Sequence, residues 1–571
     1  MTPKKPAQPS FRNDAADFLP EALGGFVASH PDATWDNHGF IARSSEITTD
    51  SGQPKVAIIS GGGSGHEPMH AGFLGRGMLD AAVPGLLFTS PNAVQITEAT
   101  RWADQGAGVV HVVKNYTGDV MNFQVARQAL DNVETRDVVV DDDVATSTDS
   151  DEPDEAGGPG RRGTGATIIV EKVVGAAAQR GDSLDEVVEL GRWTAAHSRS
   201  MAVSLAPGHL PTTGRETFDL PEGQMEVGVG IHGERGVERV DIESADAVVS
   251  RLLDGIFDDM GNDSDDFVLL VNGLGSTTEL ELSLLLGSAL KQLSERGANV
   301  RRALVGTYVT SVNMAGVSLT LTKATDQILE LLDAPTEAPA WPRVVAGSDA
   351  SLTYEPAVTN FDDQLPTSGE TNTWLTSFVE RVQGATDDLT ELDRLAGDGD
   401  FGQNMHAAFG DIELPLRGSD VDVLQALSHR LFIRAGGTSG AVLGTMFREL
   451  KIAMDNADSA TAGLTTGLEK ACSAITTLGG AEEGDNTLVD ALLPASRAAA
   501  NHGAEGDFDA LLAVCHDAAA EGADKTREMV ATKGRASYLG TATQGVVDPG
   551  AVLVSWLFGG TGKVSDFTSK S

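Results

Sequence analysis

The chain has 571 residues, 41% hydrophobic and 5% aromatic, an ordinary globular mixture that is too long for one hydrophobic core. It carries 83 acidic and 41 basic residues, a formal net charge of −42, and the acidic excess is spread along the whole chain. This charge argues against a nucleic-acid partner, because no basic stripe is present to meet phosphates. We interpret the acidic excess as salt adaptation, in which hydrated carboxylates keep the protein soluble, in preference to a partner-binding surface.

The cysteine content and the hydropathy pattern bear on where the protein works. Cys472 and Cys515 are the only cysteines, which excludes a disulfide framework and fits a reducing compartment. No apolar run approaches the length of a membrane span, and Met1–Pro6 lacks the apolar segment of a signal peptide. We therefore expect a cytoplasmic protein with no membrane partner.

Up to about residue 333 the sequence alternates strand-like and helix-like segments. Short apolar runs rich in β-branched residues predict strands at 55–59, 109–113, 137–140 and 267–271. Ser183 and Glu186 form a capping-box pattern that opens an amphipathic helix to about Ser198, and leucines at helical spacing predict another helix over 278–297. The alternation predicts an α/β fold with largely parallel sheets.

Two segments interrupt this pattern and divide the chain. Residues 141–160 are acidic and almost free of hydrophobic residues, which predicts an exposed, mobile loop. Residues 334–366 contain scattered prolines and polar residues and are expected to form an interdomain linker. In residues 367–571, alanine- and leucine-rich helical stretches alternate with glycine clusters. The expected organisation is an α/β domain over 1–333, the linker, and an all-α domain.

The first chemistry-bearing motif is Ser60–Pro68, a glycine run around His66 that follows the predicted strand at 55–59. Glycines at the carboxyl end of a strand let the backbone approach a ligand, and open α/β sheets bind ligands there. The alternative is a flexible turn with a chance histidine. The Walker A pattern does not occur anywhere in the chain, which excludes phosphate binding of that type.

Two further motifs lie at strand ends. Val113–Asp119 places Lys114 and Asp119 where they could orient a hydroxylated ligand, with Asp119 as general base, or could be ordinary turn residues. Glu226–Glu234 contains His232, whose imidazole could attack a carbonyl carbon or be a structural histidine. We reject its formal G-x-G-x-x-G match as a dinucleotide site, because the glycines lie inside a strand-like stretch instead of opening a helix.

The helical part contains three carboxylates within eight residues, Asp393, Asp398 and Asp400, in a glycine-rich segment. Hard oxygen ligands of this kind suit Mg²⁺, and the spacing of an EF-hand is missing. The alternative is an acidic turn between helices of a very acidic protein. Small-residue loops such as Gly436–Gly440 and Lys533–Tyr538 could offer backbone N–H groups to an anion, and their recurrence beside the aspartates favours a nucleotide site.

Taken in order, these motifs resemble the dihydroxyacetone kinase family over nearly the whole chain. The resemblance rests on Glu21–Pro31, Gly61–Met69, Gly75–Leu79, Phe88–Pro91, Asn115–Asp119, Arg161–Gly163, Gly228–Glu234, Gly397–Asp400, Gly484–Asp490, Lys533–Gly540 and Asp548–Gly550. It implies an α/β substrate-binding part of two subdomains, followed by an all-α, nucleotide-binding barrel of eight helices.

The resemblance also implies the site residues. The family's histidine that forms a hemiaminal with the substrate carbonyl falls on His232, and His66 and Asp119 serve the reacting hydroxyl. The substrate-binding positions are Gly63, Ser64, Gly65, His66, Lys114 and Asp119. The nucleotide contacts fall on Phe401, Gly402, Gln403, Asn404, Thr438, Ser439, Gly479, Leu488, Arg535, Asp548, Pro549 and Gly550. The magnesium ligands fall on Asp393, Asp398 and Asp400.

The implied function is phosphorylation of dihydroxyacetone by ATP and Mg²⁺ in a homodimer, with glyceraldehyde as a second candidate substrate. Covalent capture needs a carbonyl, so glycerol, which has none, is expected to be rejected. Two alternatives stay open. One is a phosphotransferase-system-linked fusion, in which a carrier protein rephosphorylates the bound nucleotide; the other is a ligand-sensing regulatory protein on the same scaffold. Both halves on one chain favour the ATP-dependent enzyme, and the complete catalytic sets argue against the sensor.

Overall fold

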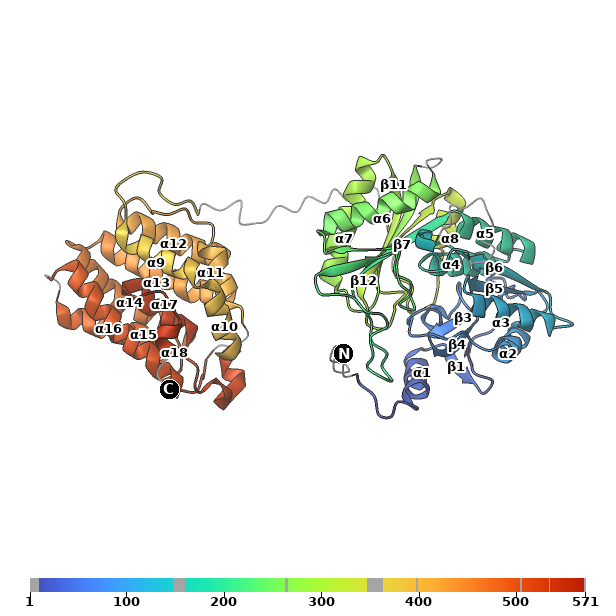
Figure 1. The fold of residues 1–571 in the computed structure, drawn as a ribbon, viewed down its shortest axis with the longest axis horizontal. Coiled ribbons are helices and arrows are strands. Elements are labelled where there is room, and N and C mark those ends of the chain that lie inside the picture. Colours follow the sequence, from blue (N-terminus) through green and yellow to red (C-terminus); the bar gives the residue numbers. More distant parts are fainter. Residues whose placement is uncertain are drawn as a thin grey trace. The chain divides into compact units, whose positions relative to one another are not determined.

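The computed structural model describes residues 10–146, 160–261, 265–342, 344–346, 363–396, 399–503, 506–533 and 535–568. The chain divides into two compact units, one within residues 1–352 and the other within 353–571 (Figure 1). The first unit is α/β and the second is all-helical, as the sequence predicts. In the described ranges, every helix is too short or too polar to cross a lipid bilayer.

The first unit contains two sheets, of which the first has the strand order β1-β2-β4-β3-β5-β6. Its strands are β1 (Ala33–Asp36), β2 (Phe40–Arg43), β3 (Ala57–Ser64), β4 (Ala81–Leu87), β5 (Val109–Lys114) and β6 (Thr135–Val140). The four strands from β4 to β6 run parallel, and β2 pairs with β4 and β1 in antiparallel fashion. The predicted strands at 55–59, 109–113 and 137–140 are confirmed, with shifted ends.

The second sheet has the order β13-β11-β10-β12-β7-β8-β9. Its strands are β7 (Ser198–Ala206), β8 (Gln224–Val227), β9 (Glu238–Asp241), β10 (Asp266–Gly273), β11 (Asn299–Gly306), β12 (Ala315–Lys323) and β13 (Val345–Ala346). Among these pairs only β10 and β11, which a helix connects, run parallel. The expectation of largely parallel sheets is therefore wrong for this sheet, in which the β7–β8, β8–β9 and β11–β12 connections contain no crossover helix.

Helices cover both sheets and fill the space between them (Figure 1). They are α1 (Phe18–Ser29), α2 (Ala93–Ala103), α3 (Thr117–Gln128), α4 (Ala166–Arg180), α5 (Leu184–Ala196), α6 (Ala245–Met260), α7 (Glu279–Glu295) and α8 (Asp326–Asp333). One core joins β3, β5 and β6 to α4 and to the inner side of β10; a second lies under α2 and α3, and a third under α6 and α7. The two helices predicted from the Ser183 capping box and from the leucine spacing over 278–297 are confirmed as α5, capped by Ser183, and α7, capped by Thr278.

Helix α4 explains an error in the predicted loop at 141–160. Asp142 and Asp143 are buried, because the Asp142 carboxylate accepts hydrogen bonds from the N–H groups of Thr164 and Ala166 at the start of α4. Asp143 is ion-paired to Arg162 at 2.6 Å. These acidic residues thus satisfy buried donors, and the exposed-loop prediction is wrong for them. Residues 147–159 of the predicted loop lie outside the described residues.

Part of the segment expected to be a linker packs on the first unit. The Ala340 N–H donates to the Gly72 carbonyl, the Trp341 ring lies edge-on to Phe73, and β13 pairs with β11. Residues 347–362 lie outside the described residues.

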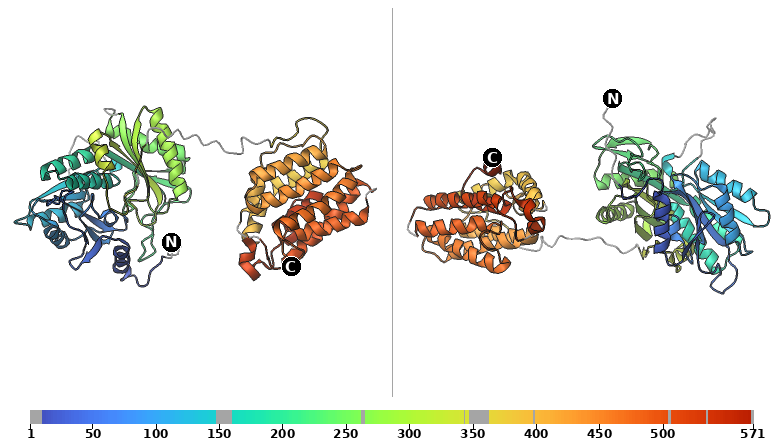
Figure 2. Two further views of the ribbon diagram at one scale, coloured as in Figure 1. Left: turned by 180° about the vertical axis from the view of Figure 1, so that it is seen from behind. Right: turned by 90° about the horizontal axis from the view of Figure 1, so that it is seen from below.

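The second unit is a set of helices that run alongside one another (Figure 2). They are α9 (Thr373–Gly384), α10 (Thr386–Ala396), α11 (Phe401–Phe409), α12 (Asp420–Arg434), α13 (Gly437–Asp455), α14 (Ala460–Gly479), α15 (Val489–His502), α16 (Phe508–Lys525), α17 (Pro549–Phe558) and α18 (Ser565–Thr568). From α11 to α17 each helix packs on the next, and α17 packs back on α9. Every residue of α17 is buried, so its apolar sequence supplies the centre of this core.

Candidate active site

The glycine run forms the end of β3 and not a turn after it, because its glycines continue the parallel pairing with β4. Glycine is needed at Gly62, where a Cβ would lie 2.1 Å from the Lys114 Nζ. Gly65 then adopts a φ of +105°, which a side chain would oppose. The chain turns there and places His66 beyond the carboxyl end of the first sheet. The motif lies at the end of the strand and not after it as predicted, and its glycines leave room for other atoms to come close.

Aromatic rings surround His232, which the first unit brings next to His66 from far away in the sequence. The ring centroids of His66 and His232 are 4.7 Å apart, edge to face. The ring of Tyr116 lies 4.5 Å from that of His232, and the ring of Phe88 lies 5.4 Å from it. We call His66, Lys114, Tyr116, Asp119 and His232 the histidine site. Its members come from the ends of β3 and β5, the start of α3, and the loop after β8.

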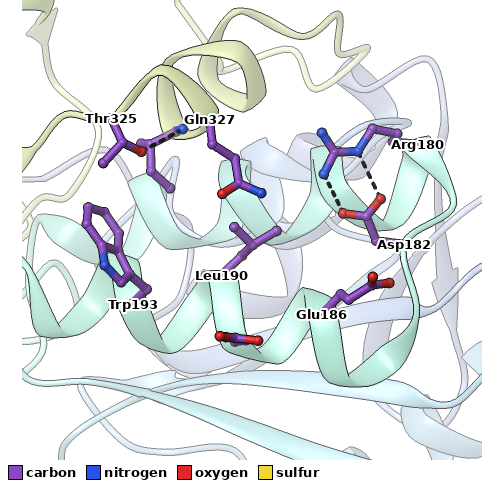
Figure 3. A pocket seen from close by; sticks show the side chains of 9 residues that line it. Arg180, Asp182, Glu186, Leu190, Trp193, Thr325 and Gln327 are labelled. Atoms are coloured by element: carbon purple, nitrogen blue, oxygen red, sulfur yellow. Dashed lines mark hydrogen bonds and ion pairs between the residues drawn. The ribbon is translucent and has the colours of Figure 1, made fainter.

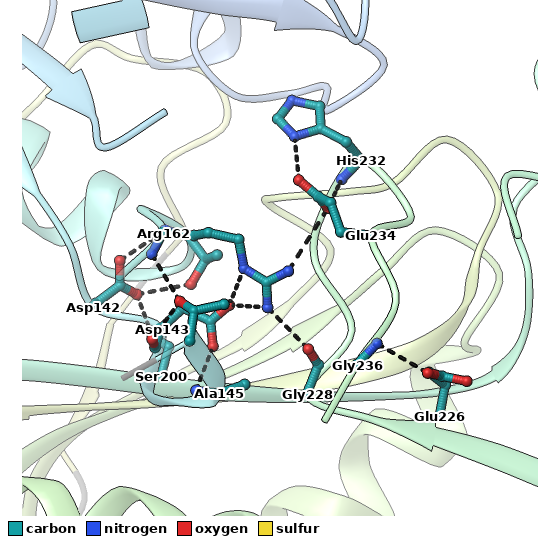
Figure 4. A network of polar contacts seen from close by, with 12 residues as sticks. Asp142, Asp143, Ala145, Arg162, Ser200, Glu226, Gly228, His232, Glu234 and Gly236 are labelled. Carbon is teal, nitrogen blue, oxygen red and sulfur yellow. Dashed lines mark hydrogen bonds and ion pairs between the residues drawn. The ribbon is translucent and has the colours of Figure 1, made fainter. Parts of the chain in front are cut away.

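The tautomer of His232 is fixed by a neighbour two residues along the chain. The Nδ1 of His232 lies 3.0 Å from the Glu234 Oε1, and the His232 backbone N–H donates to the Glu234 Oε2 at 3.0 Å (Figure 4). An Nδ1 proton therefore points to the carboxylate, so in the neutral form of the ring the lone pair is on Nε2. Burial alone would raise the pKa of Glu234, but its hydrogen bond and charge interaction with His232 outweigh this and lower it.

Arg162 supports this carboxylate from behind. Its guanidinium donates to the Asp143 carboxylate at 2.8 Å and to the Gly228 carbonyl at 2.9 Å, and it lies 4.0 Å from the Glu234 Oε2 (Figure 4). The glycines of this motif lie in the loop after β8, not inside a strand as expected, and the loop opens no helix. Because this loop opens no helix, the motif still lacks the geometry of a dinucleotide site.

Polar atoms without a partner converge in the histidine site. In the part of the chain that the structure describes, the His66 Nε2, the Tyr116 hydroxyl and the Asp119 Oδ1 are buried and have no hydrogen-bond partner. An unsatisfied buried polar group costs about 1–3 kcal/mol, so a cluster of them indicates a polar ligand. The Asp119 Oδ2 lies 3.7 Å from the Lys114 Nζ, which is itself fully buried.

Burial and nearby positive charge favour a neutral His66, whose Nε2 carries a free lone pair. Its Nδ1 lies 2.7 Å from the Thr310 carbonyl, which can only accept, so Nδ1 carries the proton and Nε2 is the unpartnered acceptor. Burial, and then the nearby His232 and Lys114, lower the pKa of His66 well below its ordinary 6.5. Burial also raises the pKa of Tyr116 well above 10.0, so its hydroxyl stays a donor. The cluster thus offers an acceptor, a donor and a carboxylate to one small ligand.

The structure therefore gathers the four predicted polar side chains, His66, Lys114, Asp119 and His232, at one end of the first sheet. The hydroxyl of the predicted substrate residue Ser64 already donates to the Gly85 carbonyl at 2.7 Å. Sequence reasoning missed the functional neighbours Tyr116 and Glu234. Both stand inside the motifs quoted for the resemblance, next to residues that were singled out, and their position is the signal that could have identified them.

The second unit contains a cavity of about 300 Å³, which we call the carboxylate cavity. It is lined by Asp393, Asp400, Phe401, Thr438, Ser439, Val442, Leu443, Ile475, Gly479, Ala481, Asn486, Thr487, Leu488, Val489, Lys533, Ala536, Asp548, Pro549 and Gly550. Helices α11, α13 and α17 begin at this wall, and backbone N–H groups at helix starts favour anions. Apolar side chains such as Val442 and Ile475 supply the rest of the lining, so an anionic ligand with an apolar ring fits it.

Ten of the residues expected to contact nucleotide or metal line this cavity, whereas Gly402, Gln403 and Asn404 do not. Gly402 packs on Thr390, Gln403 is exposed, and the Asn404 amide oxygen accepts from the Gly436 N–H at 2.9 Å. Asp398 and the side chain of Arg535 lie outside the described residues. Sequence reasoning missed Asn486 and Lys533 as lining residues, although both belong to loops that it singled out as anion sites.

The carboxylates of the cavity are crowded. The Asp393 Oδ2 accepts from the Phe401 N–H at 3.0 Å, and Asp400 precedes α11. Burial first, and then the charges of Asp490 and Asp393, raise the pKa of Asp548 to about 7. Within the described ranges no three acidic, His or Cys side chains group tightly enough to hold a metal ion. Asp393 and Asp400 nevertheless present hard oxygen donors on one wall, which fits Mg²⁺.

A further cavity of about 500 Å³ lies among α4, α5 and the start of α8 (Figure 3). Its wall includes Trp193, Glu186 and Gln327, and the Arg180–Asp182 ion pair closes one side. None of the candidate site residues predicted from sequence line it, and of its carboxylates Asp182 is ion-paired and Glu186 caps α5.

Comparison with known proteins agrees with this architecture. Residues 24–340 match the Dak1 domain and residues 395–563 match the DAK2 domain. The chain is a kinase of the two-domain type that these families define. It belongs to the dihydroxyacetone kinase family.

Relatives match along the full chain. The chain is 35% identical over 562 residues to the triokinase/FMN cyclase of Rattus norvegicus, covering 94% of this chain and 95% of the relative. It is 33% identical over 582 residues to the L-erythrulose 1-kinase of Mycolicibacterium smegmatis, covering 96% and 98%. The crystal structure of the C. freundii dihydroxyacetone kinase in complex with AMP-PNP and Mg²⁺ matches with a TM-score of 0.61 and 28% identity, covering 97% of this chain and 99% of that one.

Proposed function

We propose that the protein phosphorylates dihydroxyacetone with ATP and holds the ketose covalently on His232. The observation that carries this proposal is the free Nε2 lone pair of His232, fixed by Glu234 and surrounded by unpartnered polar atoms. A neutral imidazole of this tautomer is a nucleophile for a carbonyl carbon. The family membership and the names of the two relatives above, both kinases, support a small hydroxylated carbonyl compound as the substrate class.

In the proposed capture step, the His232 Nε2 forms a bond to the carbonyl carbon and the π electrons move to the carbonyl oxygen, which takes up a proton. The Glu234 carboxylate stabilises the positive charge that the ring gains. The Tyr116 hydroxyl, which is buried and without a partner among the described residues, would donate a hydrogen bond to the new oxygen. Because glycerol has no carbonyl, this step rejects it although it offers the same terminal hydroxyls.

In the proposed transfer step, Asp119 accepts the proton of the terminal hydroxyl that attacks the γ-phosphoryl group, and His66 accepts a hydrogen bond from the same end of the ketose. Lys114 orients Asp119 and supplies positive charge. Gly63, Ser64 and Gly65 contribute backbone to the ketose pocket. The short distance between Lys114 and Asp119 and the unpartnered His66 Nε2 support these roles.

For the second unit we propose nucleotide binding in the carboxylate cavity, by the residues that the resemblance names there. Asp393, Asp398 and Asp400 would hold Mg²⁺, whose charge would neutralise the transferring phosphoryl group. The C. freundii complex with AMP-PNP and Mg²⁺ supports this assignment. Domain limits of 1–333 and 367–571, a cytoplasmic homodimer and a salt-adapted surface remain predictions.

The test is a kinetic comparison of purified protein at high salt. With Mg·ATP we expect turnover of dihydroxyacetone, weaker turnover of glyceraldehyde, and none of glycerol. L-erythrulose is the informative second ketose, since it keeps the hydroxymethyl ketone but adds one carbon that the histidine site must fit. Turnover that needs phosphoenolpyruvate and carrier proteins would favour the phosphotransferase-linked alternative, and binding without turnover under either condition would favour the sensor.

A further inference from the structure

A chain of buried polar groups lies behind Lys114, on the side away from Asp119. The Lys114 Nζ lies 2.8 Å from the His70 Nε2 and 3.4 Å from the Gly61 carbonyl. An ammonium group only donates, so His70 presents its Nε2 lone pair to Lys114. His70 must then be neutral, with its proton on Nδ1.

The other side of His70 agrees with this tautomer. Its Nδ1 lies 2.5 Å from the Glu171 Oε1 and 2.8 Å from the Ser60 Oγ. The Ser60 hydroxyl donates to the Val112 carbonyl at 2.9 Å, so its oxygen is free to accept from Nδ1. Burial first, and then the charges of Lys114 and His66, lower the pKa of His70 well below its ordinary value. The donors of Lys114, His70 and Ser60 in this network therefore each face an acceptor.

This arrangement carries a structural cost. Lys114 and Glu171 are fully buried and His70 is 6% exposed, while the Glu171 Oε2 has no partner among the described residues. Apolar side chains of similar volume would fill the same space, between α4 and the first sheet, at lower cost in desolvation. Buried ionisable groups of this kind concentrate at functional sites.

We propose that Ser60, His70 and Glu171 are positioning residues that fix the Lys114 ammonium toward Asp119 and the bound ketose. They act through Lys114 and touch no substrate. The proposal rests on the function proposed above, and it assigns roles to three residues that the resemblance leaves without any. The N–H···O and N–H···N directions derived above are the physical basis: without the Glu171 acceptor, His70 could turn its Nε2 proton toward Lys114 and repel it.

The charged state of Glu171 gives this proposal a pH signature. Burial raises the pKa of Glu171 to about 8, against smaller opposite effects of its Ser60 hydrogen bond and the Lys114 charge. Below that pH the Glu171 carboxyl is neutral, and its Oε1 accepts the hydrogen bond from the His70 Nδ1. Above that pH Glu171 is negatively charged, which weakens the effect of the Lys114 charge on the ketose. The other ionisable groups that face Lys114 are His66 and Asp119, with His232 beyond His66. We expect kcat/KM for the ketose to fall as the pH rises through about 8.

The experiment compares Glu171→Gln and Glu171→Leu with the wild type across both sides of this pH. Glutamine has the shape and acceptor of the neutral acid, so at neutral pH kcat/KM should stay close to wild type, and the fall above pH 8 should move to higher pH. Leucine has no acceptor, so kcat/KM should drop by about tenfold to a hundredfold at every pH, the usual effect of losing a partner that orients a histidine. Lys172→Met is the matched control. Lys172 follows Glu171 on α4 but donates to the Leu331 carbonyl, so its pH profile should match the wild type.

Measurements of stability distinguish a positioning role of Glu171 from a role in folding. The folded-state pKa of Glu171 lies above its ordinary 4.5, so the folded protein holds a proton that the unfolded chain loses, and stability falls as pH rises from 4.5 toward 8. Glu171→Gln removes this loss and should unfold at the same or a higher urea concentration than wild type at pH 8. An unshifted pH profile in Glu171→Gln, or unchanged kcat/KM in folded Glu171→Leu, would overturn the proposal. A wild type that turns over no ketose would overturn the proposed function instead.

Discussion

The histidine site and the carboxylate cavity differ in their electrostatics. In the histidine site, the groups that meet the ligand are neutral or internally balanced: His66 is kept neutral, Lys114 faces Asp119, and Glu234 faces His232. In the carboxylate cavity, acidic groups crowd together and burial keeps one of them protonated near neutrality. The first arrangement suits a small uncharged ligand, and the second suits a cation together with an anion.

This electrostatic difference determines which property of a ligand each site can select. Three buried polar atoms of the histidine site have no partner among the described residues, so the site as we propose it selects its ligand by shape and by the carbonyl group. The carboxylate cavity combines several acidic residues with Lys533, so the function proposed for it includes a cation bound together with the nucleotide. Damage to one site should therefore leave the other intact, since they lie in separate compact units.

The largest effect should come from His232→Ala, which removes the nucleophile. Turnover of dihydroxyacetone should fall by about a thousandfold or more, since loss of a catalytic nucleophile has effects of that order. The residual activity should discriminate less against glycerol, because hydrogen bonds are then the only means of holding a substrate. Steady-state kinetics with both compounds checks this. An unchanged preference for dihydroxyacetone over glycerol would contradict the role of the carbonyl.

Asp400→Asn tests the carboxylate cavity in the second unit. Removing this charge should lower nucleotide-dependent turnover, by less than the loss in His232→Ala, and weaken Mg·ATP binding, while ketose capture stays intact. Calorimetry with Mg·ATP measures the first, and intact mass with dihydroxyacetone the second. Asp388→Asn, at an exposed position in the first turn of α10, is the matched control and should behave as wild type. Equal Mg·ATP affinity in Asp400→Asn and wild type would refute the metal role.

Glu234→Gln tests the histidine site more finely. Glutamine can still accept from the His232 Nδ1, but it cannot stabilise the positive charge that the ring gains in the capture step. We expect the rate of adduct formation to fall by about tenfold to a hundredfold, as for other partners that orient histidines. Glu222→Gln, at an exposed position of the same unit, serves as control. If both variants form the adduct at the wild-type rate, the Glu234 carboxylate has no part in capture.

The smallest effect concerns the acidic residues, which are spread along both units. With a formal charge of −42, the folded state should weaken as ionic strength falls, because carboxylates repel one another across a compact surface. The Debye length is about 10 Å at 0.1 M salt and about 3 Å at 1 M, so neighbouring charges interact only at the lower concentration. A melting series in KCl measures this. A midpoint that is flat or falls toward molar KCl would exclude salt adaptation.

The local patterns predicted the elements better than their arrangement. The capping boxes at Ser183 and Thr278 are local hydrogen-bond signals, and both helices begin where they indicate. The antiparallel pairing of the second sheet depends on long-range contacts that no local pattern encodes. Asp142 was assigned to an exposed loop because acidic composition says nothing of the distant N–H groups that bury it.

The candidate site divides in the same way. Motifs identified His66 and His232 as chemistry-bearing, but only the fold shows that their rings lie 4.7 Å apart. Glu171 gave no signal at all, because it stands inside an apolar helix and its partner His70 is about a hundred residues away along the chain. Such a buried network becomes visible only when hydrogen-bond directions can be followed from one residue to the next.

The central claim is that His232 binds the ketose covalently, and intact-mass measurement tests it most directly. Wild type and His232→Ala are each incubated with dihydroxyacetone or with glycerol, with mild reduction to trap a labile adduct, in the absence of nucleotide. The account predicts a mass increase of one ketose in wild type with dihydroxyacetone, and none in the other three samples. An adduct of equal yield in His232→Ala, or none in a wild type that turns over dihydroxyacetone, would contradict it.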